Sequence, residues 1–221
     1  MRVRVAAVLF DLDGTLIDSA PDLAGVANEM RLARGLLAMP YGALRPFAGS
    51  GARGMLATAL QAFPDQPTYE SLRDEFHRCY EQRMLQETAL FDAIAPVLDA
   101  LDRYRMPWGI VTNKALRFAE PMARALGLLP RASALVGGDS TPHTKPHPQP
   151  LLEAARRLGI APQQCVYIGD DPRDMRASRA AAMGGLAASW GYLGDDTPIH
   201  EWGADLVLTE PNDLLTLLDM A

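Results

Sequence analysis

The fold is decided by the stretch Val5-Ala6-Ala7-Val8-Leu9-Phe10-Asp11-Leu12-Asp13-Gly14-Thr15. Its continuous apolar run from Val5 to Phe10 is typical of a strand that is buried on both faces of a parallel sheet. In open α/β sheets, ligands bind just beyond the carboxyl ends of such strands. Asp11 and Asp13 are therefore expected at a functional site. The alternative interpretation is a solvated Asp-Gly turn between a strand and a helix.

The composition is that of an ordinary globular protein. Of the 221 residues, 48% are hydrophobic and 22% are charged. The net charge of -6 argues against nonspecific binding to nucleic acid or to acidic membranes. No apolar stretch is long enough for a membrane span, and residues 1–5 leave no room for a signal peptide. Two cysteines, Cys79 and Cys165, are too few for a disulfide scaffold. We expect a cytoplasmic protein with reduced thiols.

Strand-like and helix-like segments alternate after residue 95, which predicts an α/β fold with a parallel sheet and crossover helices. The expected strands cover residues 108–112, 134–136, 165–168, 186–189 and 206–208. The expected helices cover residues 95–104, 117–126, 150–158, 173–183 and 212–220.

The segment between the first strand and residue 91 has helical periodicity without convincing strands. We interpret residues 18–91 as an inserted helical domain, and residues 1–17 and 92–221 as the core. Within the insert, Gly49-Ser50-Gly51-Ala52-Arg53-Gly54 matches the spacing of a dinucleotide-binding fingerprint. That fingerprint needs a preceding strand, and two prolines stand there instead. A flexible loop before a helix is the expected structure.

Four short motifs occur in order along the core. They are Asp11-Leu12-Asp13-Gly14-Thr15, Thr112-Asn113-Lys114, Thr144-Lys145-Pro146-His147-Pro148 and Gly169-Asp170-Asp171-Pro172-Arg173-Asp174. As an ordered set, they resemble the phosphatases of the haloacid dehalogenase (HAD) superfamily, in the phosphoglycolate phosphatase-like group. The resemblance implies a Rossmann-like core with a helical cap of the C1 type, inserted after the first strand.

The resemblance also implies roles for the two leading aspartates. Asp11 would be the nucleophile that forms an aspartyl-phosphate, once a cation neutralises the charge between it and the phosphate. Asp13 would protonate the leaving oxygen and then activate water. The presence of this acid counts against the dehalogenase branch of the superfamily.

Mg²⁺ is the implied cofactor, because it prefers oxygen ligands in an octahedron and keeps several waters. The Asp11 carboxylate, the Asp13 carbonyl and the Asp170 carboxylate would bind it, and Asp174 would support it through a water or a hydrogen bond. The alternative for Asp171 and Asp174 is a helix N-cap with an acidic first turn. That alternative does not account for Asp170.

Thr112 and Lys145 would bind the phosphoryl oxygens, with Asn113 as a substrate contact. The alternative for Lys145 is a solvated loop lysine. Lys114 is expected to be exposed. His143 and His147 are interpreted as loop residues, since Mg²⁺ does not favour imidazole.

Further stretches resemble the N-acetylmuramic acid 6-phosphate phosphatases of cell-wall recycling, and 2-phosphoglycolate is the alternative substrate. The stretches are Trp108–Lys114, Arg117–Pro121, Gly169–Asp171, Gly191-Tyr192, Trp202–Asp205 and Gly51–Arg53. Both substrates carry a carboxylate, which Arg53, or else Arg45, would bind. A phosphomutase and a non-catalytic binding protein are the remaining alternatives. The sequence does not predict the oligomeric state.

Overall fold

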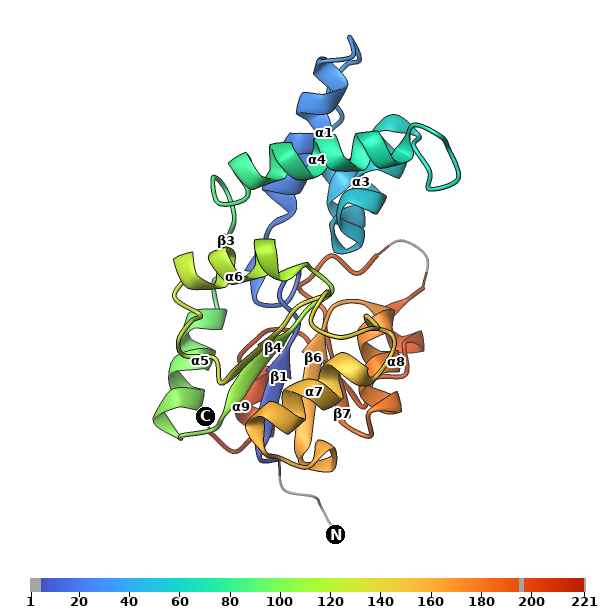
Figure 1. Ribbon diagram of the computed structural model, residues 1–221. Coiled ribbons are helices and arrows are strands. Elements are labelled where there is room, and N and C mark those ends of the chain that lie inside the picture. Colours follow the sequence, from blue (N-terminus) through green and yellow to red (C-terminus); the bar gives the residue numbers. More distant parts are fainter. Residues whose placement is uncertain (1–4, 195–196, 221) are drawn as a thin grey trace.

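A six-stranded parallel sheet forms the centre of the computed structural model, which describes residues 5–194 and 197–220 (Figure 1). The strand order is β5-β4-β1-β6-β7-β8, so the chain winds outward from β1 in both directions. β1 pairs with β4 on one side and with β6 on the other. The strands are β1 (Ala7–Phe10), β4 (Trp108–Val111), β5 (Ala134–Val136), β6 (Cys165–Gly169), β7 (Gly184–Ala188) and β8 (Leu206–Leu208). Where the winding direction reverses, the carboxyl ends of β1 and β6 form a crevice.

Helices cover both faces of this sheet. Val8 and Phe10 of β1 pack against one group of helices, and Ala7 and Leu9 pack against the other, because successive side chains of a strand point to opposite faces. The first group is α5 (Ile94–Arg103), α6 (Leu116–Ala125) and α9 (Asp213–Leu217), and the second is α7 (Gln149–Leu158) and α8 (Pro172–Ala180). The predicted α/β fold with a parallel sheet flanked by helices is confirmed.

The predicted strands and helices after residue 95 are all present, with shifts of a few residues. The expected ends of two helices were wrong. α8 ends at Ala180 rather than residue 183, and α9 ends at Leu217 rather than residue 220. Ala182 and Asp219 have φ values of 56°. These left-handed backbone conformations turn the chain out of each helix.

The helices of residues 20–83 lie together beyond the carboxyl ends of the strands (Figure 1). They are α1 (Ala20–Leu32), α2 (Tyr41–Leu44), α3 (Gly51–Leu60) and α4 (Tyr69–Arg83), and they share their own apolar cluster. We call them the helical layer. The division into a core and a cap at residues 17/18 and 91/92 stays a prediction.

Two short strands join the helical layer to the core. β2 (Ile17–Asp18) and β3 (Ala89–Leu90) pair antiparallel. The expectation that the inserted segment contains no strands was therefore wrong at both of its ends. Strands of two residues are too short to show a period in the sequence.

The glycine-rich motif is helical rather than a flexible loop. Arg45–Ser50 forms a 3-10 helix, and α3 begins at Gly51, so that Arg53 lies on α3. A Cβ atom on Gly54 would lie 2.5 Å from the carbonyl oxygen of Phe47. Gly54 therefore allows the 3-10 helix to pack closely against α3. A 3-10 helix, not a strand, precedes the motif.

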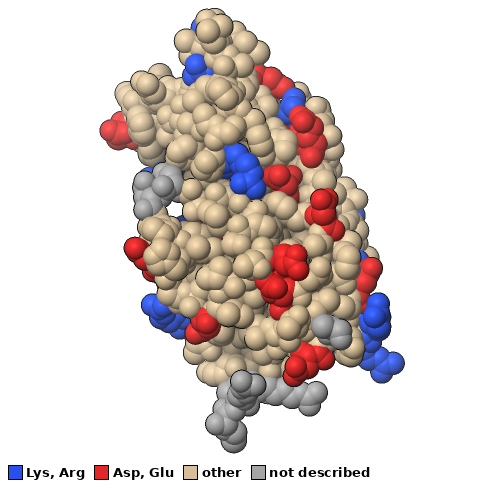
Figure 2. All heavy atoms as spheres, turned by 180° about the vertical axis from the view of Figure 1, so that it is seen from behind, with Lys and Arg blue, Asp and Glu red and all other residues tan. Residues whose placement is uncertain are grey.

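Acidic and basic side chains are scattered over the face shown in Figure 2, without a continuous basic patch. Within the described residues, no helix has both the length and the apolar character needed to cross a bilayer. Cys79 and Cys165 are free thiols, as expected. Residues 1–4, part of the stretch on which the signal-peptide expectation depended, lie outside the described residues.

We expect Phe10→Ala to lower the free energy of unfolding by about 3–5 kcal/mol, because it leaves a cavity between β1 and the helices. The Phe10 ring is 1% exposed and meets Trp108 edge-on at 6.2 Å. Urea denaturation measures the change. The control is Leu152→Ala on α7, where the side chain is 39% exposed and the loss should stay below about 1 kcal/mol. Equal losses for the two variants would contradict the assigned core.

Candidate active site

The turn after β1 brings two carboxylates into the crevice. The Asp11 amide donates to the Ile168 carbonyl at 2.8 Å, which continues the β1–β6 ladder by one residue. The chain then turns at Gly14, with φ +80°. A Cβ atom on Gly14 would lie 2.1 Å from Asp170 Oδ2, so only glycine fits beside that carboxylate. The solvated Asp-Gly turn is thus the wrong interpretation.

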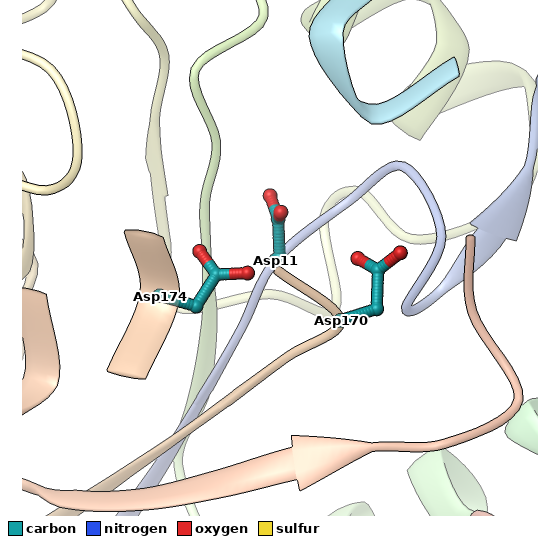
Figure 3. A group of neighbouring side chains, drawn as sticks. All are labelled: Asp11, Asp170 and Asp174. Carbon is teal, nitrogen blue, oxygen red and sulfur yellow. The ribbon is translucent and has the colours of Figure 1, made fainter. Parts of the chain in front are cut away.

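Asp11, Asp170 and Asp174 form an acidic cluster (Figure 3). One carboxylate oxygen from each lies within 4.8 Å of the others. The three residues come from the end of β1, the end of β6 and the first turn of α8. An all-oxygen set of this kind suits a hard divalent cation. His143 and His147 are exposed and stack on each other at 4.2 Å, away from the cluster.

The electrostatics of the cluster favour a bound cation. Burial raises the pKa of Asp170 well above its usual range, and the Asp11 and Asp174 carboxylates raise it further. Burial also raises the pKa of Asp174 to about 7, against the opposing effect of Lys145. The pKa of Asp11 is raised by burial as well. A divalent cation would remove the repulsion that these shifts reflect.

Asp174 is already engaged by protein groups. Its Oδ1 lies 2.8 Å from Lys145 Nζ, and its Oδ2 accepts from the Asp171 amide at 3.1 Å. Asp171 is the N-cap of α8 and completes a capping box with Asp174. The helix-cap interpretation of this pair is confirmed. Among the described residues, Asp170 Oδ1 accepts one hydrogen bond, from Thr15 Oγ1 at 3.3 Å.

Lys145 lies at the centre of the site rather than in a solvated loop. Its side chain is 2% exposed, and Nζ lies 2.9 Å from Asp11 Oδ1. Nζ also donates to the Tyr167 hydroxyl at 2.7 Å, which in turn donates to the Val111 carbonyl at 2.7 Å. Burial acts to lower the pKa of Lys145, but Asp11 and Asp174 outweigh it and raise the pKa. The ammonium group therefore stays charged beside Asp11.

Asn113 holds Lys145 in place. Its side-chain oxygen accepts from the Lys145 amide at 2.9 Å, and its side-chain nitrogen donates to the Lys145 carbonyl at 3.0 Å. Asn113 also lines the cavity, and its expected contact with substrate stays a prediction. Thr112 is buried, and its Oγ1 accepts from the Lys114 amide at 3.1 Å, which leaves the hydroxyl proton available.

Lys114 is not exposed, contrary to expectation. Its side chain is 10% exposed, and Nζ lies 2.9 Å from Asp13 Oδ1. Nζ also lies 4.9 Å from the ring centroid of Tyr80 on α4. Asp13 thus has a cationic partner from the end of β4. The motif Thr112-Asn113-Lys114 contained this residue, but nothing in the sequence indicated its partner.

A cavity of about 380 Å³ separates the carboxyl ends of the strands from the helical layer. Asp11, Asp13, Thr112, Lys145 and Asp170 lie on its floor. The other walls are mainly aromatic and cationic: Arg53 of α3; Tyr69, Arg73, Phe76, His77 and Tyr80 of α4; Arg117 and Phe118 of α6.

The two candidate arginines differ in position. Arg53 is exposed and lines the cavity. Arg45 is not among the lining residues. Its guanidinium group donates to the Gly191 carbonyl at 3.0 Å and lies 5.2 Å from the ring centroid of Tyr192. Arg45 therefore makes a loop contact, and of the two arginines only Arg53 lines the cavity.

Comparison with known proteins agrees with this site. The family model of haloacid dehalogenase-like hydrolases matches residues 5–182. A phosphoglycolate phosphatase of Xanthomonas campestris is 47% identical over 209 residues, 94% of each chain. An N-acetylmuramic acid 6-phosphate phosphatase of Pseudomonas aeruginosa is 41% identical over 221 residues, 100% of this chain and 97% of the relative.

A solved structure extends the likeness to the fold. The crystal structure of a "predicted phosphoglycolate phosphatase" of Haemophilus somnus has a TM-score of 0.86 and 25% identity, and the match covers 98% of this chain and 99% of that one. The chain belongs to the haloacid dehalogenase-like hydrolases, and it is a phosphatase of that family. This result overturns the alternative of a non-catalytic binding protein.

We expect Asp170→Asn to raise the Tm of the metal-free protein at pH 8. A carboxyl group with a higher pKa in the folded state stabilises the fold at low pH, and this contribution is lost as the pH rises through the folded pKa. For Asp174 that window runs from 3.8 to about 7. The pKa of Asp170 is also raised above 3.8, so removing its charge should help at pH 8 and change little below about pH 4.

Thermal denaturation with and without magnesium chloride measures both effects. The metal should raise the Tm of the native protein by a few degrees, about 2–4 °C for each 1 kcal/mol of binding free energy. It should leave Asp170→Asn unchanged. A native Tm that does not respond to the metal, together with a less stable variant at pH 8, would contradict a cation site here.

Proposed function

We propose that this phosphatase hydrolyses N-acetylmuramic acid 6-phosphate in cell-wall recycling. The observation that carries the proposal is the cavity above Asp11, whose volume of about 380 Å³ exceeds what a phosphate group needs. It falls in the range of roughly 300–1,000 Å³ that is usual for small-molecule sites. The relative from Pseudomonas aeruginosa, aligned over the whole chain, bears the same activity in its name. We further propose that the reaction takes place in the cytoplasm.

Asp11 is the proposed nucleophile. One of its carboxylate oxygens forms a bond to phosphorus while the bond from phosphorus to the C6 oxygen breaks. Asp13 gives its proton to the departing oxygen. Asp13 then takes a proton from water, which attacks the aspartyl-phosphate and releases inorganic phosphate. Asp11 returns to its carboxylate form.

The cationic groups of the site balance the charge of the phosphoryl group. Lys145 Nζ, 2.9 Å from Asp11 Oδ1, supports a role for this lysine beside the transferred phosphoryl group. The Thr112 hydroxyl would donate a hydrogen bond to a phosphoryl oxygen. Asp11 and Asp170, with the Asp13 carbonyl, would hold Mg²⁺, and Asp174 would support it through a hydrogen bond. When bound, Mg²⁺ neutralises charge between nucleophile and phosphate.

The helical layer is proposed to act as a cap that recognises the rest of the substrate. Tyr69, Phe76, Tyr80 and Phe118 offer apolar faces suited to a sugar ring. Arg53, which forms no ion pair with any residue that the structure describes, is the proposed partner of the substrate carboxylate. Closure over the substrate would also exclude water.

2-Phosphoglycolate is the second candidate substrate. The relatives from Xanthomonas campestris and Xylella fastidiosa, at 47% and 42% identity, are named for it. Its two-carbon chain would reach little of the aromatic wall, so the first candidate makes fuller use of the cavity. A phosphomutase has no comparable support.

We expect Asp11→Asn to abolish turnover of any phosphate ester without unfolding the protein, because an amide cannot attack phosphorus. Asp13→Asn should lose at least about 10²-fold in kcat, the usual contribution of a positioned acid–base. Phosphate release from p-nitrophenyl phosphate in excess magnesium measures both rates, and Tm confirms folding. Near-native activity of Asp11→Asn would refute the proposed nucleophile.

We expect kcat/KM to be higher for N-acetylmuramic acid 6-phosphate than for 2-phosphoglycolate. Arg53→Ala should lower kcat/KM about 10-fold or more on both carboxylate-bearing substrates and change p-nitrophenyl phosphate by less than about 2-fold. Arg103→Ala, an exposed arginine in the last turn of α5, is the matched control. An equal loss on all three substrates would assign Arg53 to folding or closure instead.

A further inference from the structure

Tyr192 joins the helical layer to the acidic site. The residue follows β7 in the chain and is 4% exposed. Its hydroxyl oxygen accepts from the Ser19 amide at 2.8 Å and from the Ala20 amide at 3.1 Å. The hydroxyl proton is directed to Asp18 Oδ1 at 3.2 Å. One phenol group therefore fixes the start of α1.

The start of α1 has no side-chain cap. Ser19 occupies the N-cap position of α1, where a serine hydroxyl commonly accepts from the first amides of the helix. Here the Ser19 side chain makes no such bond, and its hydroxyl donates instead to Asp13 Oδ1. The Tyr192 phenol accepts from the amides of Ser19 and Ala20, and so holds the backbone that carries the serine hydroxyl.

The other end of Tyr192 contacts the proposed metal site. Its backbone amide donates to Asp170 Oδ2 at 2.7 Å. The preceding Gly191 fits tightly here, since a Cβ atom on it would lie 2.2 Å from Asp170 Cβ. Arg45, in the 3-10 helix before α3, contacts this loop as well. Its guanidinium group donates to the Gly191 carbonyl and packs on the Tyr192 ring.

We infer that Tyr192 is a positioning residue for Asp13, acting through Ser19, while its backbone helps to position Asp170. The phenol fixes the Ser19 backbone, and the Ser19 hydroxyl fixes the Asp13 carboxylate. Tyr192 touches neither phosphate nor nucleophile. The inference rests on the roles proposed for Asp13 and Asp170, but not on the identity of the natural substrate.

The experiment is a double-mutant cycle on p-nitrophenyl phosphate with magnesium. Tyr192→Phe keeps the ring and removes the acceptor of the Ser19 amide, while the Ala20 amide keeps Asp18 Oδ1 as a second acceptor at 3.2 Å. We expect a kcat loss of about 10-fold, with KM changed by less than about 2-fold, because Thr112 and Lys145 are not in contact with Tyr192. Ser19→Ala should show a similar loss, and Ser19→Thr, which keeps a hydroxyl, should recover most of it.

The double variant separates positioning from general destabilisation. If both residues act on Asp13 through one chain of contacts, Ser19→Ala with Tyr192→Phe should lose about as much kcat as either single variant. Tyr104→Phe, an exposed tyrosine after α5, is the control and should retain native kcat. If Tyr192→Phe does not fold, the comparison of Ser19→Ala with Ser19→Thr still tests the contact between Ser19 and Asp13, and no recovery in Ser19→Thr would refute it.

Two results would overturn the inference. One is a kcat of Tyr192→Phe within about 2-fold of native. The other is a double variant whose loss is the product of the single losses, about 100-fold, since independent effects multiply. Asp13→Asn is assayed in parallel. Full activity of that variant would refute the proposed role of Asp13 itself, whereas an inactive Asp13→Asn with a fully active Tyr192→Phe would refute only the positioning by Tyr192.

Discussion

Crowding of buried carboxylates at the carboxyl ends of β1 and β6 is the constraint on which the rest of the structure depends. Burial disfavours the charges of Asp11, Asp170 and Asp174, and the Asp11 carboxylate further raises the pKa of both Asp170 and Asp174. Lys145 is the resident countercharge, and its buried position depends on Asn113 and Tyr167. The site thus keeps electrostatic repulsion that a divalent cation can relieve.

Much of the floor of this site is predictable from the sequence, because it follows from chain order. Asp11 and Asp170 come directly after buried apolar runs, and parallel strands place such residues along one edge of a sheet. Lys145 becomes identifiable only within the ordered set of motifs. The apolar residues of the core helices and strands likewise recur at the spacing typical of each element, so these elements are also predictable.

The contacts that tune the site are not predictable in this way. Lys114 meets Asp13 across 101 residues of chain, and Tyr192 meets Ser19 across 173. In the sequence, nothing distinguishes Tyr167 from the other residues of its buried strand. Each lies in a segment whose pattern is fully explained by secondary structure, so its partner is decided only when distant segments fold together. Asn113 shows the same limit, since it lines the cavity but its bonds to the Lys145 backbone could not be predicted from the sequence.

The two short strands β2 and β3 determine how the helical layer can move. The chain crosses between core and layer twice, and the crossings are hydrogen-bonded to each other. Asp22 of α1 strengthens the connection by accepting from the amides of Glu87 and Thr88 just before β3. Two independent tethers would allow twisting and sliding in many directions. A paired ribbon would restrict the proposed closure chiefly to one rotational degree of freedom, so the layer would return along the same arc to the same register over the carboxylates.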